Sequence, residues 1–121
     1  MTTCMVVDDS RVIRKLASKM LGDLGMMTFE AENGAVAYEM CSASMPDVIL
    51  LDWNMPVLDG MEFLKKLRST NFARQPKVLF CTTESEFSKI AQALTEGADE
   101  YIMKPFDEDI LASKLRLIGA L

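Results

Sequence analysis

Short apolar runs alternate along the chain with stretches in which apolar residues recur every three or four positions. Four of the runs are apolar on both faces and rich in Val and Ile, which is typical of buried strands in a parallel sheet. These runs cover residues 4–7, 48–51, 78–81 and 101–103. A fifth run, at residues 27–31, is more polar, and we predict an edge strand there.

The segments between the runs have the 3.6-residue periodicity of amphipathic helices. Their predicted core stripes are Ile13, Leu16, Ala17, Met20, Leu21 and Leu24; Val36, Ala37 and Met40; Phe63, Leu64 and Leu67; Phe87, Ile90, Ala91 and Leu94; and Leu111, Leu115 and Ile118. Ser10 and Asp107 stand at N-cap positions, and Gly97 ends the fourth helix. We interpret Asn33-Gly34 as a turn.

Strands and helices therefore alternate five times, which predicts a parallel sheet with helices on both faces. The chain has 121 residues, enough for one domain with a single core, and we expect that domain to cover residues 1–121. No run approaches the roughly 20 apolar residues of a membrane-spanning helix. The first strand follows the initial Met almost at once, so we expect no signal peptide and a cytoplasmic location.

Chemically active side chains follow four of the five predicted strands. They are Asp8 and Asp9, Asp52, Thr82 and Thr83, and Lys104 with Pro105. In open parallel sheets, functional groups gather outside the carboxyl ends of the strands, so we expect these side chains to converge at one edge. Three crowded carboxylates repel one another unless a proton or a cation binds. Oxygen ligands favour a hard cation: Mg²⁺, Mn²⁺ or Ca²⁺.

The same groups suit phosphoryl transfer. An aspartate can act as the nucleophile that forms an aspartyl phosphate, and Asp52 lies at a strand end beside the other carboxylates. Such a reaction needs mainly positioning and charge neutralisation. A bound Mg²⁺, the Lys104 ammonium and the Thr82 hydroxyl would supply these.

Composition excludes several other functions. The net charge is −5, and the basic residues form no stripe, so the chain is not expected to bind nucleic acid. It contains no His, which removes His-dependent triads and most zinc sites. Cys4, Cys41 and Cys81 are an odd number of cysteines, and we interpret them as reduced thiols rather than a disulfide framework.

The joint pattern resembles the receiver domain of two-component response regulators, and most of all its free-standing CheY-like type. The matching residues are Asp8 and Asp9, Asp52-Trp53-Asn54-Met55-Pro56 with Asp59-Gly60, Thr82, and Lys104-Pro105-Phe106. The resemblance covers essentially the whole chain. It implies a flavodoxin-like (βα)5 three-layer α/β sandwich with strand order 2-1-3-4-5.

The resemblance also implies a role for each site residue. Asp52 would accept the phosphoryl group, with Lys104 and Thr82 assisting. Mg²⁺, with Mn²⁺ as an acceptable substitute, would be held by Asp8, Asp9, Asp52 and the backbone carbonyl of Asn54. Thr82 and Tyr101 would form the switch, and the bond before Pro105 would be cis. Asn54, Thr83 and Glu84 would tune the kinetics; the family usually has Ala or Gly where this chain has Thr83.

As a response regulator, the chain would take its phosphoryl group from a histidine kinase or from acetyl phosphate. It would signal by binding a downstream protein through the face formed by residues 84–121, as a monomer without membrane insertion. Chemotaxis or motility and a phosphorelay are both consistent with this pattern. It would be no turnover enzyme, although it would catalyse its own phosphorylation and dephosphorylation.

Three alternatives stay open at this point. A small aspartyl-phosphate phosphatase also places an Asp nucleophile beside Mg²⁺, but it needs a general acid two residues later, where this chain has Asn54. A phosphate-independent interaction module would be expected to lack one of the acidic residues or the lysine. The chain could also be the receiver part of a longer protein.

Overall fold

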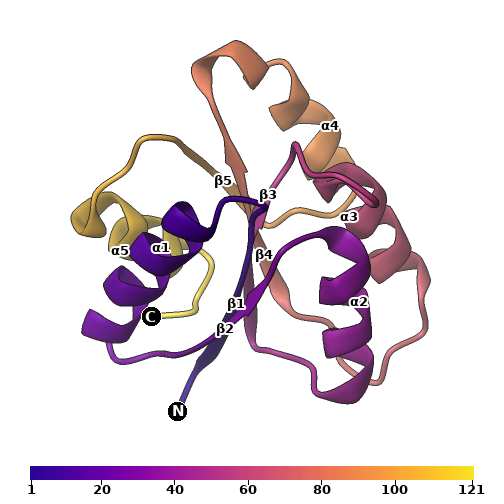
Figure 1. Cartoon of the computed structure of the whole chain (residues 1–121), viewed down its shortest axis with the longest axis horizontal. Coiled ribbons are helices and arrows are strands. Elements are labelled where there is room, and N and C mark those ends of the chain that lie inside the picture. Colours follow the sequence, from indigo (N-terminus) through magenta and orange to yellow (C-terminus); the bar gives the residue numbers. More distant parts are fainter.

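A five-stranded parallel sheet is the middle layer of the protein in a computed structural model that describes residues 1–121 (Figure 1). The strands are β1 (Thr3–Val7), β2 (Met27–Ala31), β3 (Val48–Asp52), β4 (Lys77–Thr82) and β5 (Glu100–Met103). They lie in the order β2-β1-β3-β4-β5. The predicted flavodoxin-like fold and strand order are therefore confirmed.

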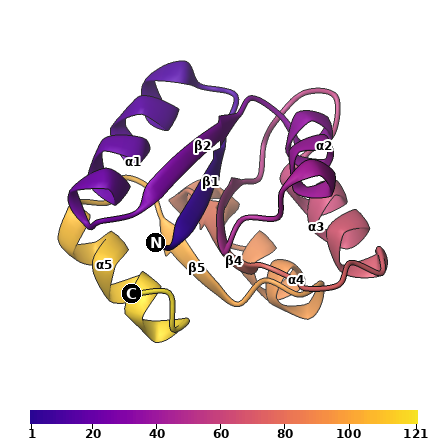
Figure 2. The same ribbon diagram turned by 90° about the horizontal axis from the view of Figure 1, so that it is seen from below.

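Helices cover both faces of this sheet (Figure 2). They are α1 (Arg11–Asp23), α2 (Gly34–Ala43), α3 (Gly60–Ser69), α4 (Lys89–Thr95) and α5 (Glu108–Leu117), with a short 3-10 helix, η1 (Glu84–Glu86), before α4. Helices α1 and α5 lie on one face, and α2, α3 and α4 lie on the other. None of the helices combines the length and the apolar character needed to cross a membrane.

The sheet separates two apolar cores. Phe63, Leu64 and Phe80 belong to the core beneath α2 and α3, while Leu79 and Leu111 belong to the core beneath α1 and α5. All five residues of β3 are buried, as expected for a central strand with helices on both faces. The edge position predicted for residues 27–31 is also confirmed, since β2 pairs only with β1.

Side-chain caps begin four helices where the sequence supplies short polar residues: Ser10, Asn33, Asp59 and Asp107. The Ser10 hydroxyl accepts the Ile13 backbone N–H at 3.2 Å, which confirms the predicted cap of α1. Asn33 Oδ1 accepts the backbone N–H three residues later at 2.9 Å, so Asn33-Gly34 begins α2 instead of forming the predicted turn. The reason is that Asn is among the preferred N-cap residues. Asp107 caps α5 as predicted.

Two predicted core stripes were partly wrong. Leu16 in α1 is 52% exposed, and Phe87 and Leu94 near α4 are 52% and 42% exposed. In α4, only Ile90 and Ala93 are buried. The helix begins at Lys89, after η1, and it is only seven residues long, so one narrow side of it packs on the sheet. Periodicity alone could not show that the remaining apolar positions face solvent.

Gly60 allows the loop after β3 to pack closely against the strand end. Its backbone N–H donates to the carbonyl of Trp53 at 2.8 Å. A Cβ atom at this position would overlap the backbone carbonyl of Asp52 and would lie 2.9 Å from the Cα of Trp53. Only glycine therefore fits between the start of α3 and the end of β3.

We predict that Gly60→Ala lowers the free energy of unfolding by about 2 kcal/mol or more, because rigid backbone must move to admit the methyl group. Gly22→Ala is the matched control, since nothing lies within 4 Å of a Cβ there. It should stabilise α1 by up to about 1 kcal/mol through helix propensity. Urea unfolding of both variants checks this; equal stability of the two would contradict the close packing.

Candidate functional site

The polar side chains singled out in the sequence lie at the carboxyl ends of β1, β3, β4 and β5. The chain leaves β1 toward α1 on one face of the sheet and leaves β3 toward α3 on the opposite face. Neighbouring connections that diverge in this way open a crevice above the strand ends, where open α/β sheets bind ligands.

Three carboxylates meet in this crevice. One oxygen each from Asp8, Asp9 and Asp52 lies within 4.8 Å of the other two. Asp8 and Asp52 are buried, at 4% and 7% exposure, whereas Asp9 is exposed. The predicted convergence of these side chains is therefore present in the structure.

Lys104 joins two of the three carboxylates. Its Nζ donates to Asp8 Oδ2 at 2.9 Å and to Asp52 Oδ1 at 2.8 Å. The Lys104 backbone N–H donates to the carbonyl of Thr82 at 2.7 Å, which anchors the loop after β5 to the end of β4. The peptide bond between Lys104 and Pro105 is cis.

Asp8 is also held from the side of α1. Its Oδ1 accepts the Ser10 backbone N–H at 2.9 Å, and its carbonyl accepts from the Arg14 guanidinium at 2.8 Å. Arg14 in turn pairs with Glu30 on β2 at 3.1 Å. Sequence reasoning treated Ser10 only as a helix cap and did not identify Arg14. The Asp8-Asp9-Ser10 spacing was a usable signal, since Asp often accepts the N–H two residues later.

Burial and charge act in opposite directions on the two buried partners. Burial raises the pKa of Asp52, and the negative charges of Asp8 and Asp9 add to this, while the Lys104 ammonium works against it. Burial alone would lower the pKa of Lys104, but its bonds to Asp52 and Asp8 outweigh that effect and raise it. The lysine therefore stays charged, and two carboxylates share one positive charge.

The donor set fits a hard divalent cation. With all four groups ionised, three carboxylates and one ammonium leave an excess of two negative charges. Asp9 makes no ion pair, and Lys104 contacts only one oxygen of Asp52, so carboxylate oxygen remains available to a metal. Oxygen ligands without nitrogen or sulfur favour Mg²⁺ or a similar ion.

The two threonines after β4 point in different directions. Thr82 is fully buried, and its hydroxyl donates to the carbonyl of Thr83 at 3.2 Å rather than to Asp52. The Thr83 hydroxyl lies 3.0 Å from Glu86 Oε1 and 2.9 Å from the hydroxyl of Ser85. Neither hydroxyl thus bonds to Asp52: the Thr82 hydroxyl bonds to the Thr83 backbone, and the Thr83 hydroxyl bonds to η1. Sequence reasoning missed the role of Glu86. Its signal was the Thr-x-x-Glu spacing of a capping box.

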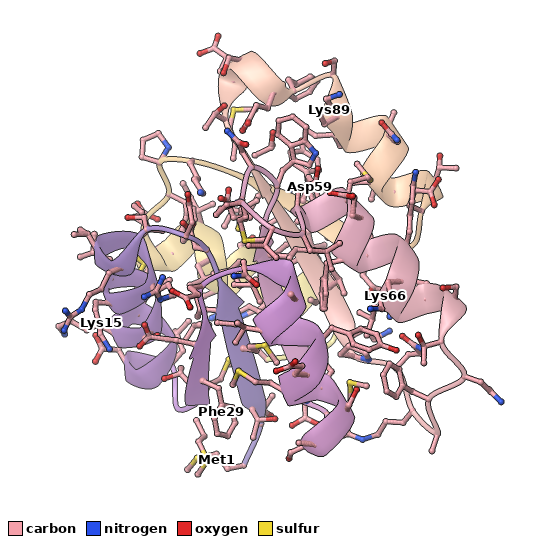
Figure 3. All side chains as sticks on the ribbon, turned by 45° about the vertical axis from the view of Figure 1, so that its right-hand side comes forward. Met1, Lys15, Phe29, Asp59, Lys66 and Lys89 are labelled. Atoms are coloured by element: carbon pink, nitrogen blue, oxygen red, sulfur yellow. The ribbon has the colours of Figure 1, made fainter.

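The aromatic residues near the site contact α4 and α5. The Tyr101 ring packs edge-on against Phe87, with ring centroids 6.3 Å apart, and the Lys114 Nζ lies 4.1 Å from the Tyr101 centroid. Trp53, directly after Asp52, has the Nζ of Lys89 5.0 Å from its ring centroid; Figure 3 labels this lysine on α4. The loop after β3 is therefore in contact with α4 through Lys89, and the edge strand β5 is in contact with the turn between η1 and α4 through Phe87.

This combination of a flavodoxin-like sheet with an acidic crevice and a bridging lysine defines an α/β protein whose strand ends carry three carboxylates that could hold a metal ion. A family model, the response regulator receiver domain, matches residues 4–116, and the chain belongs to that family. It is therefore a receiver domain of two-component signalling, a switch that phosphorylation activates.

Similar proteins come from several bacteria. The chain is 35% identical over 116 residues to the chemotaxis protein CheY1 of Helicobacter pylori, and the alignment covers 94% of each chain. It is 32% identical over 115 residues to the chemotaxis protein CheY of Pseudomonas aeruginosa, covering 94% of this chain and 93% of that one. The structure of CheY4 of Vibrio cholerae superposes with a TM-score of 0.89 at 33% identity, over 98% of both chains.

We predict that Asp9→Asn weakens Mg²⁺ binding without lowering the stability of the metal-free protein. In EDTA the variant should melt no lower than wild type, because one carboxylate leaves a mutually repelling cluster. On addition of Mg²⁺, its gain in Tm should be no more than roughly half that of wild type. Thermal scans with and without Mg²⁺ measure both effects, with Glu39→Gln on the exposed side of α2 as the control. If Mg²⁺ raised the Tm of the variant as much as that of wild type, Asp9 would not be a metal ligand.

Proposed function

We propose that Asp52 is the residue that accepts the phosphoryl group. One observation carries this assignment: Lys104 contacts one oxygen of each buried carboxylate, but the second oxygen of Asp8 accepts the Ser10 N–H, whereas the second oxygen of Asp52, at the end of the central strand β3, accepts no hydrogen bond. Its second oxygen is free to attack phosphorus. A P–N bond to a histidine or a P–O bond of acetyl phosphate would break as the new O–P bond forms.

The residues around Asp52 would hold the reacting group in place. Asp8, Asp9, Asp52 and the backbone carbonyl of Asn54 would hold Mg²⁺, or Mn²⁺ in its place. The bound metal would neutralise charge on the phosphoryl oxygens. Lys104 would exchange part of its contact with Asp52 for a phosphoryl oxygen, because its ammonium is charged and can turn without a large movement.

The switch would follow from the same contacts. The Thr82 hydroxyl would leave the carbonyl of Thr83 and donate to the phosphoryl group, and Tyr101 would move inward into the space that the loop vacates. Such a change is a population shift, so the phosphoryl group must interact better with the active state. Asn54, Thr83 and Glu84 lie near enough in sequence to Asp52 and Thr82 to tune the reaction rates.

The protein would then act as a switch and not as a turnover enzyme, catalysing only its own phosphorylation and dephosphorylation. A histidine kinase donates the phosphoryl group in this family, and acetyl phosphate would replace it in vitro. A downstream protein would dock on the face formed by residues 84–121 of a monomeric, cytoplasmic domain that covers residues 1–121. Chemotaxis is the favoured pathway, because the relatives described above are chemotaxis proteins.

Trp53 makes the proposal testable, because it is the only tryptophan and directly follows Asp52. We expect its fluorescence to change when Mg²⁺ is added and to change again with acetyl phosphate. Intact-mass measurement should show one added phosphoryl group. Asp52→Asn should abolish the second change and the mass gain. A phosphorylated Asp52→Asn protein would overturn the assignment of Asp52, and wild type that gains no mass would overturn the proposed function.

We predict that Thr82→Val uncouples phosphorylation from the conformational change. The substitution removes the hydroxyl and keeps the branched shape at a fully buried position. The variant should still gain one phosphoryl group, but the phosphorylation-dependent part of the Trp53 signal should fall to less than about half. Thr95→Val, which removes an exposed hydroxyl from α4, is the control. If the Thr82 variant kept the full phosphorylation-dependent change in Trp53 fluorescence, a group other than the Thr82 hydroxyl would couple phosphorylation to the conformational change.

A further inference from the structure

Glu86 binds the backbone and the side chain of Thr83 at three points. Its backbone N–H donates to the Thr83 carbonyl at 3.0 Å. Its Oε1 accepts from the Thr83 backbone N–H at 3.3 Å and from the Thr83 hydroxyl at 3.0 Å. These contacts form a capping box around η1, and they fix the orientation of the Thr83 residue on both sides of its Cα atom.

The Thr83 carbonyl, which bonds to the Glu86 backbone, also bonds to Thr82, the proposed switch residue. The Thr83 carbonyl accepts from the Glu86 backbone N–H and also from the Thr82 hydroxyl, at 3.2 Å. The Thr82 hydroxyl keeps this partner only while the Thr83 carbonyl keeps its orientation. The Glu86 side chain supports that orientation from the other side of the Thr83 Cα atom, through the Thr83 N–H and hydroxyl. Because Thr82 is fully buried, releasing its hydroxyl without a new partner would be unfavourable.

We propose that Glu86 is a positioning residue that acts as a brake on activation. By clamping Thr83, it keeps the Thr82 hydroxyl turned away from Asp52 and so favours the inactive state. The inference rests on the proposed function, because it concerns how Thr82 reaches a phosphoryl group on Asp52. The Thr83 hydroxyl strengthens the brake, since an Ala or Gly at this position would have no hydroxyl to donate to Glu86 and would keep only the backbone N–H bond.

Removing the clamp should make the active state easier to reach. Any ligand that prefers the active state then binds more tightly, because less of its binding free energy is used to shift the equilibrium. Beryllofluoride with Mg²⁺ is a suitable probe, since it mimics a phosphoryl group on a carboxylate. Its affinity can be followed through Trp53 fluorescence without phosphoryl turnover.

The first experiment compares wild type with Glu86→Ala, with Thr83→Val as a second route to the same loss of a hydroxyl bond. We expect Glu86→Ala to bind beryllofluoride about three- to fivefold more tightly, in line with the usual strength of a capping interaction. Thr83→Val should change the affinity in the same direction by a smaller factor. Glu62→Ala is the matched control, because Glu62 closes the capping box of α3 on Asp59 and makes no contact with Thr82 or Thr83.

A second experiment excludes a general effect on stability. In a Thr82→Val background there is no hydroxyl to release, so adding Glu86→Ala should leave the affinity unchanged within about twofold. The brake is overturned if Glu86→Ala binds beryllofluoride no more tightly than wild type does. It is also overturned if Glu62→Ala shows the same gain or if the gain persists with Thr82→Val. If wild type bound no beryllofluoride, the proposed function would be wrong as well. This result differs from those above, in which wild type binds beryllofluoride and only the proposal for Glu86 fails.

Discussion

The bond between the Lys104 ammonium and two buried carboxylates is the interaction on which the rest of the site depends. It connects the loop after β5 to the ends of β1 and β3, which are far apart in the sequence and adjacent only in the folded sheet. Without the ammonium, Asp8 and Asp52 would be two unpaired negative charges in a mostly apolar surrounding, which is strongly unfavourable. The lysine therefore stabilises the fold at the same place where it would assist the proposed chemistry.

The same interaction also decides how much negative charge the site has left to attract a cation. Lys104 carries one positive charge and faces two carboxylates, so one negative charge is left over when all three groups are ionised. The third carboxylate, Asp9, is exposed and makes no ion pair, and it raises this excess to two. Asp9 thus supplies negative charge without the cost of burial, while the buried Asp52 is the proposed nucleophile. The division explains why two adjacent aspartates follow β1 although only Asp8 contacts the lysine.

Topology accounts for what could be predicted from the sequence. Short runs that are apolar on both faces indicate buried strands, and the carboxyl ends of parallel strands share one edge, so the order of residues along the chain was enough to group Asp8, Asp9, Asp52 and Lys104. The hydrophobic pattern could not show the direction of the Thr83 hydroxyl, because it depends on a three-residue 3-10 turn whose signal is the Thr-x-x-Glu spacing and not apolar periodicity. Nor could the exposure of Phe87, because the length of α4 decides which positions pack. Local hydrogen bonds, not the hydrophobic pattern, settle how this segment is arranged.

Those local hydrogen bonds are also well matched to the work of a switch. Each bond that holds Thr82 and Thr83 contributes only about 1 kcal/mol net, or somewhat more where the Glu86 carboxylate accepts. A phosphoryl group that gains contacts with Lys104 and Thr82 can outweigh a few such bonds, whereas it could not unfold a helix anchored in the core. In the proposed switch, the inactive state is therefore held by η1, which has no buried residue, next to a sheet that does not need to move. The end of β3 would carry the chemistry, and the weakly held turn after the neighbouring strand β4 would respond to it.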